Sequence, residues 1–157
     1  MILLAGCGYR AGSLLAIGPH GQAASVQTVG CLDVAVVPIV DGEAAGPVAG
    51  YRFANRCDRP LRIDLGAARV TGIFPDGKSR VLRVFDPNGQ IRPGTLDARA
   101  WGKENLEYEL SPESAPPTQL CIDLSRLNAS ARGAGPKVQV CIAAFVNHAP
   151  NTELARR

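Results

Sequence analysis

The chain has few of the residues that usually support catalysis or metal binding. Only two of its 157 residues are histidines, His20 and His148, and they lie near opposite ends of the chain. A catalytic triad or a zinc site needs histidine beside specific partners, and no G-x-S-x-G, H-E-x-x-H or P-loop pattern is present. We therefore expect no enzymatic activity, no cofactor and no metal.

Long apolar runs and concentrated charge are also missing. No segment approaches the roughly 20 apolar residues of a membrane-spanning helix. The net charge is only +3, aromatic residues make up 5%, and the arginines are scattered singly. A nucleic-acid surface needs a basic stripe or an aromatic stacking platform, so we expect no nucleic-acid partner.

Glycine and proline are abundant, at 17 and 12 residues, and favour turns over long helices. No window has a sustained apolar stripe with helical spacing. Segments of alternating apolar residues begin instead at Leu32, Tyr51, Leu61, Val70, Val81, Leu106, Leu120 and Val138. Strands that recur about every 8–12 residues indicate an antiparallel sandwich. We expect an all-β, immunoglobulin-like β-sandwich of about seven to nine strands over residues 31–147.

Turn chemistry separates these segments. Pro75-Asp76-Gly77 and Asp86-Pro87-Asn88-Gly89 each lie between apolar runs and predict hairpin turns. Asp86 and Asn88 also suggest a calcium loop, but the twelfth position of such a loop is Asp97 instead of the required Glu. The lone Trp101 lies in a polar stretch, so we expect it outside the core.

Four of the five cysteines lie within the expected domain: Cys31, Cys57, Cys121 and Cys141. Their spacing contains no C-x-x-C pair, which argues against zinc ribbons and thioredoxin-like chemistry. An even internal set predicts two disulfides in an oxidising compartment. Strand parity favours Cys31–Cys57 and Cys121–Cys141 among three possible pairings. Four buried free thiols in a cytosolic protein are the alternative.

The fifth cysteine, Cys7, ends the sequence Leu4-Ala5-Gly6-Cys7. This sequence resembles the lipobox of bacterial lipoproteins. The resemblance implies that Cys7 is lipidated, that cleavage occurs before it, and that its new amino terminus is acylated, for example with palmitate. Since a complete signal peptide spans roughly 15–30 residues, we expect residues 1–6 to be the remnant of one.

The same resemblance suggests a location. Gly8 stands where enteric inner-membrane lipoproteins have Asp, so we expect an outer-membrane protein on the periplasmic or surface face, held in the bilayer through acylated Cys7. Residues 7–30 are expected to form a tether, and residues 148–157 a polar tail.

Tether, disulfides and sandwich together predict a non-enzymatic envelope lipoprotein that acts as a binding or structural module for a periplasmic or outer-membrane protein partner. An exposed edge strand is a natural contact, and Leu32–Val37 is one candidate. A second hypothesis is an accessory role in lipopolysaccharide assembly, because Cys7-Gly8-Tyr9-Arg10 is similar to the start of lipoproteins that plug the lipopolysaccharide translocon. A third is a carboxylate-based hydrolase, for which the acidic residues are Asp97, Glu104, Glu107 and Glu109.

Overall fold

The computed structural model describes Tyr9, Leu14, Gly21 and residues 18–19, 23–128 and 136–146. Cys7, His20, His148 and the segments 1–6 and 148–157 lie outside the described residues. The strands are β1 (Val26–Val29), β2 (Leu32–Ile39), β3 (Val48–Asn55), β4 (Leu61–Ile63), β5 (Arg69–Ile73), β6 (Ser79–Leu82), β7 (Gly94–Leu96), β8 (Trp101–Glu107), β9 (Gln119–Asp123) and β10 (Gln139–Ala143). One short 3-10 turn, η1 (Leu65–Ala67), follows β4.

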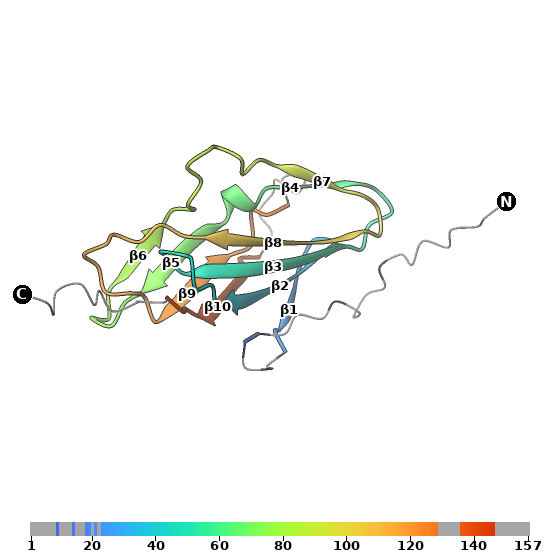
Figure 1. Ribbon diagram of the computed structural model, residues 1–157. Helices are drawn as coiled ribbons and strands as arrows, with labels where there is room; N and C mark the ends of the chain where they lie inside the picture. Colours follow the sequence, from blue (N-terminus) through green and yellow to red (C-terminus); the bar gives the residue numbers. More distant parts are fainter. Residues whose placement is uncertain are drawn as a thin grey trace, which may run out of the picture.

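The strands form two four-stranded sheets and a small ribbon (Figure 1). The order is β1-β2-β3-β8 in the first sheet and β10-β9-β5-β6 in the second, while β4 pairs with β7. Every pairing is antiparallel. The expected all-β antiparallel fold is confirmed. The described strands number ten, above the expected seven to nine, because β4 and β7 form a separate ribbon.

In the first sheet β1, β2 and β3 follow one another and β8 lies beside β3. In the second sheet β9 lies between β5 and β10, and β6 extends the sheet beside β5.

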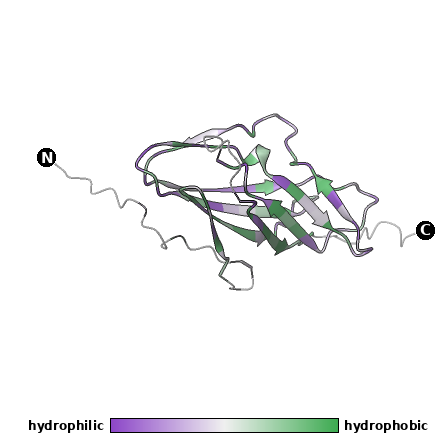
Figure 2. Cartoon of the chain, turned by 180° about the vertical axis from the view of Figure 1, so that it is seen from behind, coloured by the Kyte–Doolittle hydropathy of each residue, from purple (hydrophilic) through white to green (hydrophobic). Residues whose placement is uncertain are grey.

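The core lies between the two sheets. Alternate residues of β2, Leu32, Val34 and Val36, are buried against inward residues of the second sheet such as Leu120 and Ile122. Figure 2 shows much of the hydrophobic colouring on the strands of the sandwich. Since a fully buried aliphatic side chain contributes roughly 1.5–3 kcal/mol, this layer supplies most of the attraction between the sheets.

β2 is buried on both of its faces, which corrects one expectation. It lies between β1 and β3, so Leu32–Val37 is not an edge strand open to a partner. On the outer face of the sheet, Ala35 and Val37 are covered by Leu14, Ala24 and Ile39. The last part of the expected tether, residues 26–29, forms β1 and pairs with β2 in the first sheet. The continuous apolar run of β2 is typical of a strand covered on both faces.

The two predicted turns have different outcomes. Pro75-Asp76-Gly77 joins β5 to β6 in a hairpin, in which Gly77 has a φ of 76° and donates its N–H to the Phe74 carbonyl at 2.9 Å. Asp86-Pro87-Asn88-Gly89 also turns, with the Gly89 N–H bonded to the Asp86 carbonyl at 3.2 Å. However, the chain after this second turn does not return along β6, so it forms no hairpin.

Each sheet has one disulfide, which joins two neighbouring strands. The two bonded pairs are the ones that the sequence analysis favours. Cys31 and Cys57 are bonded just before β2 and just after β3. Cys121 and Cys141 are directly opposite each other in β9 and β10 and are bonded there. Neither bond crosses from one sheet to the other, so packing must hold the sheets together.

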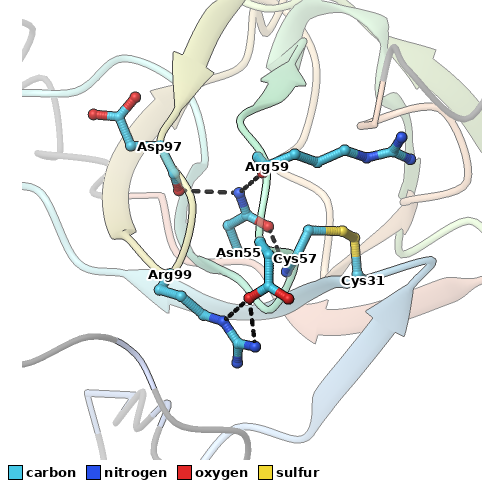
Figure 3. Close-up of polar contacts among 7 residues, drawn as sticks. Cys31, Asn55, Cys57, Arg59, Asp97 and Arg99 are labelled. Atoms are coloured by element: carbon cyan, nitrogen blue, oxygen red, sulfur yellow. Dashed lines mark hydrogen bonds and ion pairs between the residues drawn. A yellow bond between two sulfur atoms is a disulfide. The ribbon is translucent and has the colours of Figure 1, made fainter.

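Asn55 is a buried polar side chain that forms several hydrogen bonds with the backbone (Figure 3). Its amide nitrogen donates to the carbonyls of Arg59 at 2.8 Å, Asp97 at 2.9 Å and Leu96 at 3.2 Å. Its side-chain oxygen accepts the N–H of Cys57 at 2.8 Å. Because the side chain is fully buried, these bonds tie the end of β3 to the disulfide corner and to the connection between β7 and β8.

Asn55→Ala is expected to lower the free energy of unfolding by about 3 kcal/mol, because it leaves the Cys57 N–H and several carbonyls buried without partners. The measurement is urea unfolding followed by circular dichroism. Asn105→Ala is the matched control, since Asn105 is exposed and accepts one bond, from Arg52 at 3.3 Å. Equal losses for the two variants would contradict a structural role for the Asn55 bonds.

Candidate binding site at the junction of the two sheets

The two sheets meet where the chain beyond β6 crosses to the chain beyond β8. Val84 and Tyr108 form an isolated antiparallel bridge. The Phe85 N–H donates to the Glu107 carbonyl at 2.8 Å, and the Glu109 N–H donates to the Arg83 carbonyl at 2.7 Å. The edges of the two sheets therefore touch at this junction and separate on either side of it.

A buried pair of tyrosines supports the junction from inside the core. The hydroxyls of Tyr51 on β3 and Tyr108 lie 2.5 Å apart and share a hydrogen bond. Burial raises the pKa of Tyr51 well above its ordinary value, and the neighbouring Tyr108 raises it further. Burial also raises the pKa of Tyr108, to about 12, although its bond to Tyr51 acts in the opposite direction. Both phenols are therefore neutral at physiological pH.

The loop that precedes β3 is fixed to the junction. A carboxylate oxygen of Glu107 accepts the N–H groups of Ala45 at 2.8 Å and of Gly46 at 2.9 Å. A Cβ atom at Gly46 would overlap the carbonyl oxygen of Tyr108, so only glycine fits at this close approach. Glu107, one of the acidic residues named for a possible hydrolase, is thus half-buried and accepts hydrogen bonds from two backbone N–H groups.

A hollow of about 570 Å³ opens on one side of the junction, between β6 and the chain that follows β8. Val81 and Phe85, two of its lining residues, are 54% and 49% exposed. The other lining residues are Ala45, Gly46, Leu82, Arg83, Glu107, Glu109, Leu110 and Ser111. The hollow is therefore an apolar strip with polar groups at its rim, a composition suited to a peptide side chain.

A second hollow of about 390 Å³ lies on the other side of the junction, along the edge of β8. It shares Phe85 and Glu107 with the first and is capped by the turn that begins at Asp86. The Asp86 carboxylate accepts the N–H groups of Gln90 at 2.7 Å and Ile91 at 3.0 Å. Asp86 therefore stabilises this turn through backbone bonds.

One edge of β6 is open along the first hollow. β6 is the last strand of its sheet and pairs with β5 alone. Among the described residues, none pairs with the opposite edge of Ser79–Leu82. Unpaired backbone groups at a sheet edge are a template for an added strand. Parity places Val81, Arg83 and Phe85 on one side of this segment, with Leu82 and Val84 packed against the core.

The sequence indicated parts of this site without joining them. Val81–Phe85 was expected as a strand and Glu107 and Glu109 as residues of another, but no local signal brings the two segments together. The expected acidic set is dispersed as well: Glu104 and Glu107 line the second hollow, whereas Asp97 lies at the Asn55 end of the sandwich. The described residues contain no group of three or more His, Cys, Asp or Glu side chains placed to hold a metal ion.

A lowered carboxyl pKa occurs on β9, away from both hollows. Partial burial acts to raise the pKa of Asp123, but hydrogen bonds from Ser125 and the charges of Lys137 and Arg126 lower it overall. The Ser125 N–H donates to this carboxylate at 3.0 Å. A general acid needs the opposite shift, so Asp123 is a structural cap of the turn after β9.

Comparisons with known proteins add no relative. No protein-family model matches the chain, and neither curated proteins nor solved structures give a match. In the described part of the chain, no helix has the length and apolar character needed to span a bilayer.

The tyrosine pair predicts a cooperative alkaline transition. Because the folded pKa of each phenol exceeds the unfolded value near 10, the unfolded state loses protons first, and stability present below pH 10 is lost as the pH rises toward about 12. Absorbance at 295 nm should show Tyr51 and Tyr108 ionising only together with loss of the circular dichroism signal. Tyr108→Phe should remove one phenolate from this step. Ionisation of both core tyrosines in folded protein would refute this explanation.

Proposed function

We propose that the protein is a non-enzymatic, lipid-anchored envelope module that binds an extended segment of a periplasmic or outer-membrane protein partner by strand addition to β6. The observation on which this rests is the open edge of Ser79–Leu82, lying along a hollow with Val81 and Phe85 exposed. Main-chain bonds to the edge would supply affinity, and the hollow would select side chains.

Three features support the location. The lipobox-like Leu4-Ala5-Gly6-Cys7 predicts acylation at Cys7, which gives stable attachment when two or more chains are present. The two disulfides are typical of an oxidising compartment such as the periplasm. The outer membrane remains the expected location, because Gly8 follows Cys7 where enteric inner-membrane lipoproteins have Asp.

The alternatives receive less support from the same observations. An accessory role in lipopolysaccharide assembly rests on four residues at the N-terminus, and the relatives in question pair strands with helices, whereas the described helical structure is limited to η1. A hydrolase would need two carboxyl groups about 5–5.5 Å or 6.5–9.5 Å apart in a cleft. Glu107, the best-placed candidate, already accepts two backbone N–H groups.

Expression with the native upstream region in a Gram-negative host, followed by intact mass under non-reducing conditions, tests the anchor. The expected species begins at Cys7, has three acyl chains and lacks four protons because of the two disulfides. Cys7→Ala should lose all acylation. Cys31→Ala with Cys57→Ala should retain it while lacking only two protons. An unmodified mass with five free thiols would reject both the export and the anchor.

Photo-crosslinking in the same cells tests the β6 edge. A photoreactive residue at Val81 or Phe85 should label one envelope protein, whereas at Val40, which is 53% exposed in the β2–β3 connection, it should not. Val81→Asp should reduce the yield from position 85 about tenfold or more, because it removes the burial of one aliphatic side chain. Equal labelling from positions 40 and 81, or no effect of Val81→Asp, would rule out strand addition at this edge.

A further inference from the structure

Tyr9 docks on the outer face of the first sheet, at the end of the sandwich where β8 begins. Its N–H donates to the Arg99 carbonyl at 2.7 Å, and its hydroxyl donates to an Asp33 carboxylate oxygen at 2.7 Å. Ala54 stands between Asp33 and Trp101 in the same cross-strand row and is fully buried. Tyr9 therefore spans this row from the start of β8 to β2.

The Asp33 carboxylate that accepts the Tyr9 hydrogen bond has two further partners. Asp33 accepts a second hydrogen bond, from the Thr28 hydroxyl at 2.9 Å, and forms an ion pair with Arg56 at 3.1 Å. Its side chain is only 6% exposed. A buried carboxylate with three partners holds its donors firmly, so Tyr9 is attached to the folded domain and does not form part of a free tether.

The attachment restricts where an anchor at Cys7 can lie. Only Gly8 separates Cys7 from Tyr9, and the two residue steps between them reach at most about 7 Å. An acyl chain on Cys7 would therefore enter the bilayer beside this face of the first sheet. The protein would not hang from the membrane on a long linker.

The same face has an exposed tryptophan and two unneutralised cations. Trp101 is 62% exposed on β8, the largest exposure among the big apolar side chains of the described residues. In the next row of this face, Arg52 and Lys103 lie directly opposite each other on β3 and β8. No carboxylate of the described residues forms an ion pair with either of them.

This arrangement is costly for a surface in water. Like charges directly opposite each other in an antiparallel pair repel, and the exposed ring of Trp101 leaves apolar surface in contact with water. Beside an anionic bilayer, attraction to the lipids would offset this repulsion, and the ring could be buried. Tryptophan favours the headgroup region, each Lys or Arg near the surface is attracted to anionic lipid, and Trp101 lies about 7 Å from Lys103 along the strand.

We infer that the outer face of the first sheet around Trp101, Arg52 and Lys103 lies flat on an anionic phospholipid surface, with Tyr9 holding the N-terminal anchor at that face. The orientation of the anchor rests on the proposed acylation of Cys7, whereas the lipid affinity of the face does not. The β6 edge belongs to the other sheet and would be left free for a protein partner.

The experiment uses the full chain with Cys7→Ala and vesicles of phosphatidylethanolamine and phosphatidylglycerol at 3:1. Trp101 is the only tryptophan, so its emission reports this face alone. We expect a blue shift on binding and quenching by brominated lipid. Arg52→Gln with Lys103→Gln should weaken partitioning about 10- to 30-fold, and 0.5 M salt should do the same. The matched control, Arg69→Gln on β5 with Lys78→Gln just before β6, should bind like the parent.

A second arm uses the acylated protein in the same vesicles. If Tyr9→Ala reduces the quenching of Trp101 by brominated lipid, Tyr9 holds the outer face of the first sheet against the bilayer. Unshifted emission in both arms overturns the inference, even if Cys7 is acylated; crosslinks from position 101 to an envelope protein would then assign this face to a protein partner. Conversely, a blue shift in the first arm, together with an intact mass showing that cells leave wild-type Cys7 unacylated, would refute the proposed anchor while supporting the lipid-binding face.

Discussion

The pairing of β2 with β3 is the constraint on which the rest of the structure depends. All eight residues of each strand are in register, from Leu32 opposite Asn55 to Ile39 opposite Val48. This register decides which residues face the second sheet and which face outward. It also places Cys31 and Cys57 at the same end, where the disulfide closes the pair. A slip by one residue would move Val34 and Val36 out of the core and Asp33 into it.

The two ends of this pair have different consequences. At the Asn55 end, the buried amide and the Asp33 carboxylate join the disulfide corner, the start of β8 and Tyr9 through hydrogen bonds. At the other end, the junction of Val84 with Tyr108 brings the second sheet against β8. The proposed lipid-facing surface and the proposed protein-binding edge therefore lie on different sheets, so both contacts can be made at once.

The candidate site exists because the sandwich is not closed at β6, the last strand of the second sheet. A fully closed barrel has no open edge, whereas here, among the described residues, β6 pairs with β5 alone and its outer edge stays open. The Tyr51–Tyr108 bond and the Glu107 contacts with Ala45 and Gly46 hold this opening in a fixed shape. Rigid walls reduce the entropy lost when an extended segment binds.

The sequence by itself determined the local structure of this protein. Period-two alternation located most of the strands, the β5–β6 turn followed from Pro75 and Gly77, and parity favoured the disulfide partners, because each depends on residues close in the chain. Only the tertiary structure decided that β2 is covered on both faces, that Val84 meets Tyr108, and that Asn55 and Asp33 are polar centres of the fold. Those features depend on which distant segments become neighbours, and an alternating pattern identifies an apolar face without naming what packs against it.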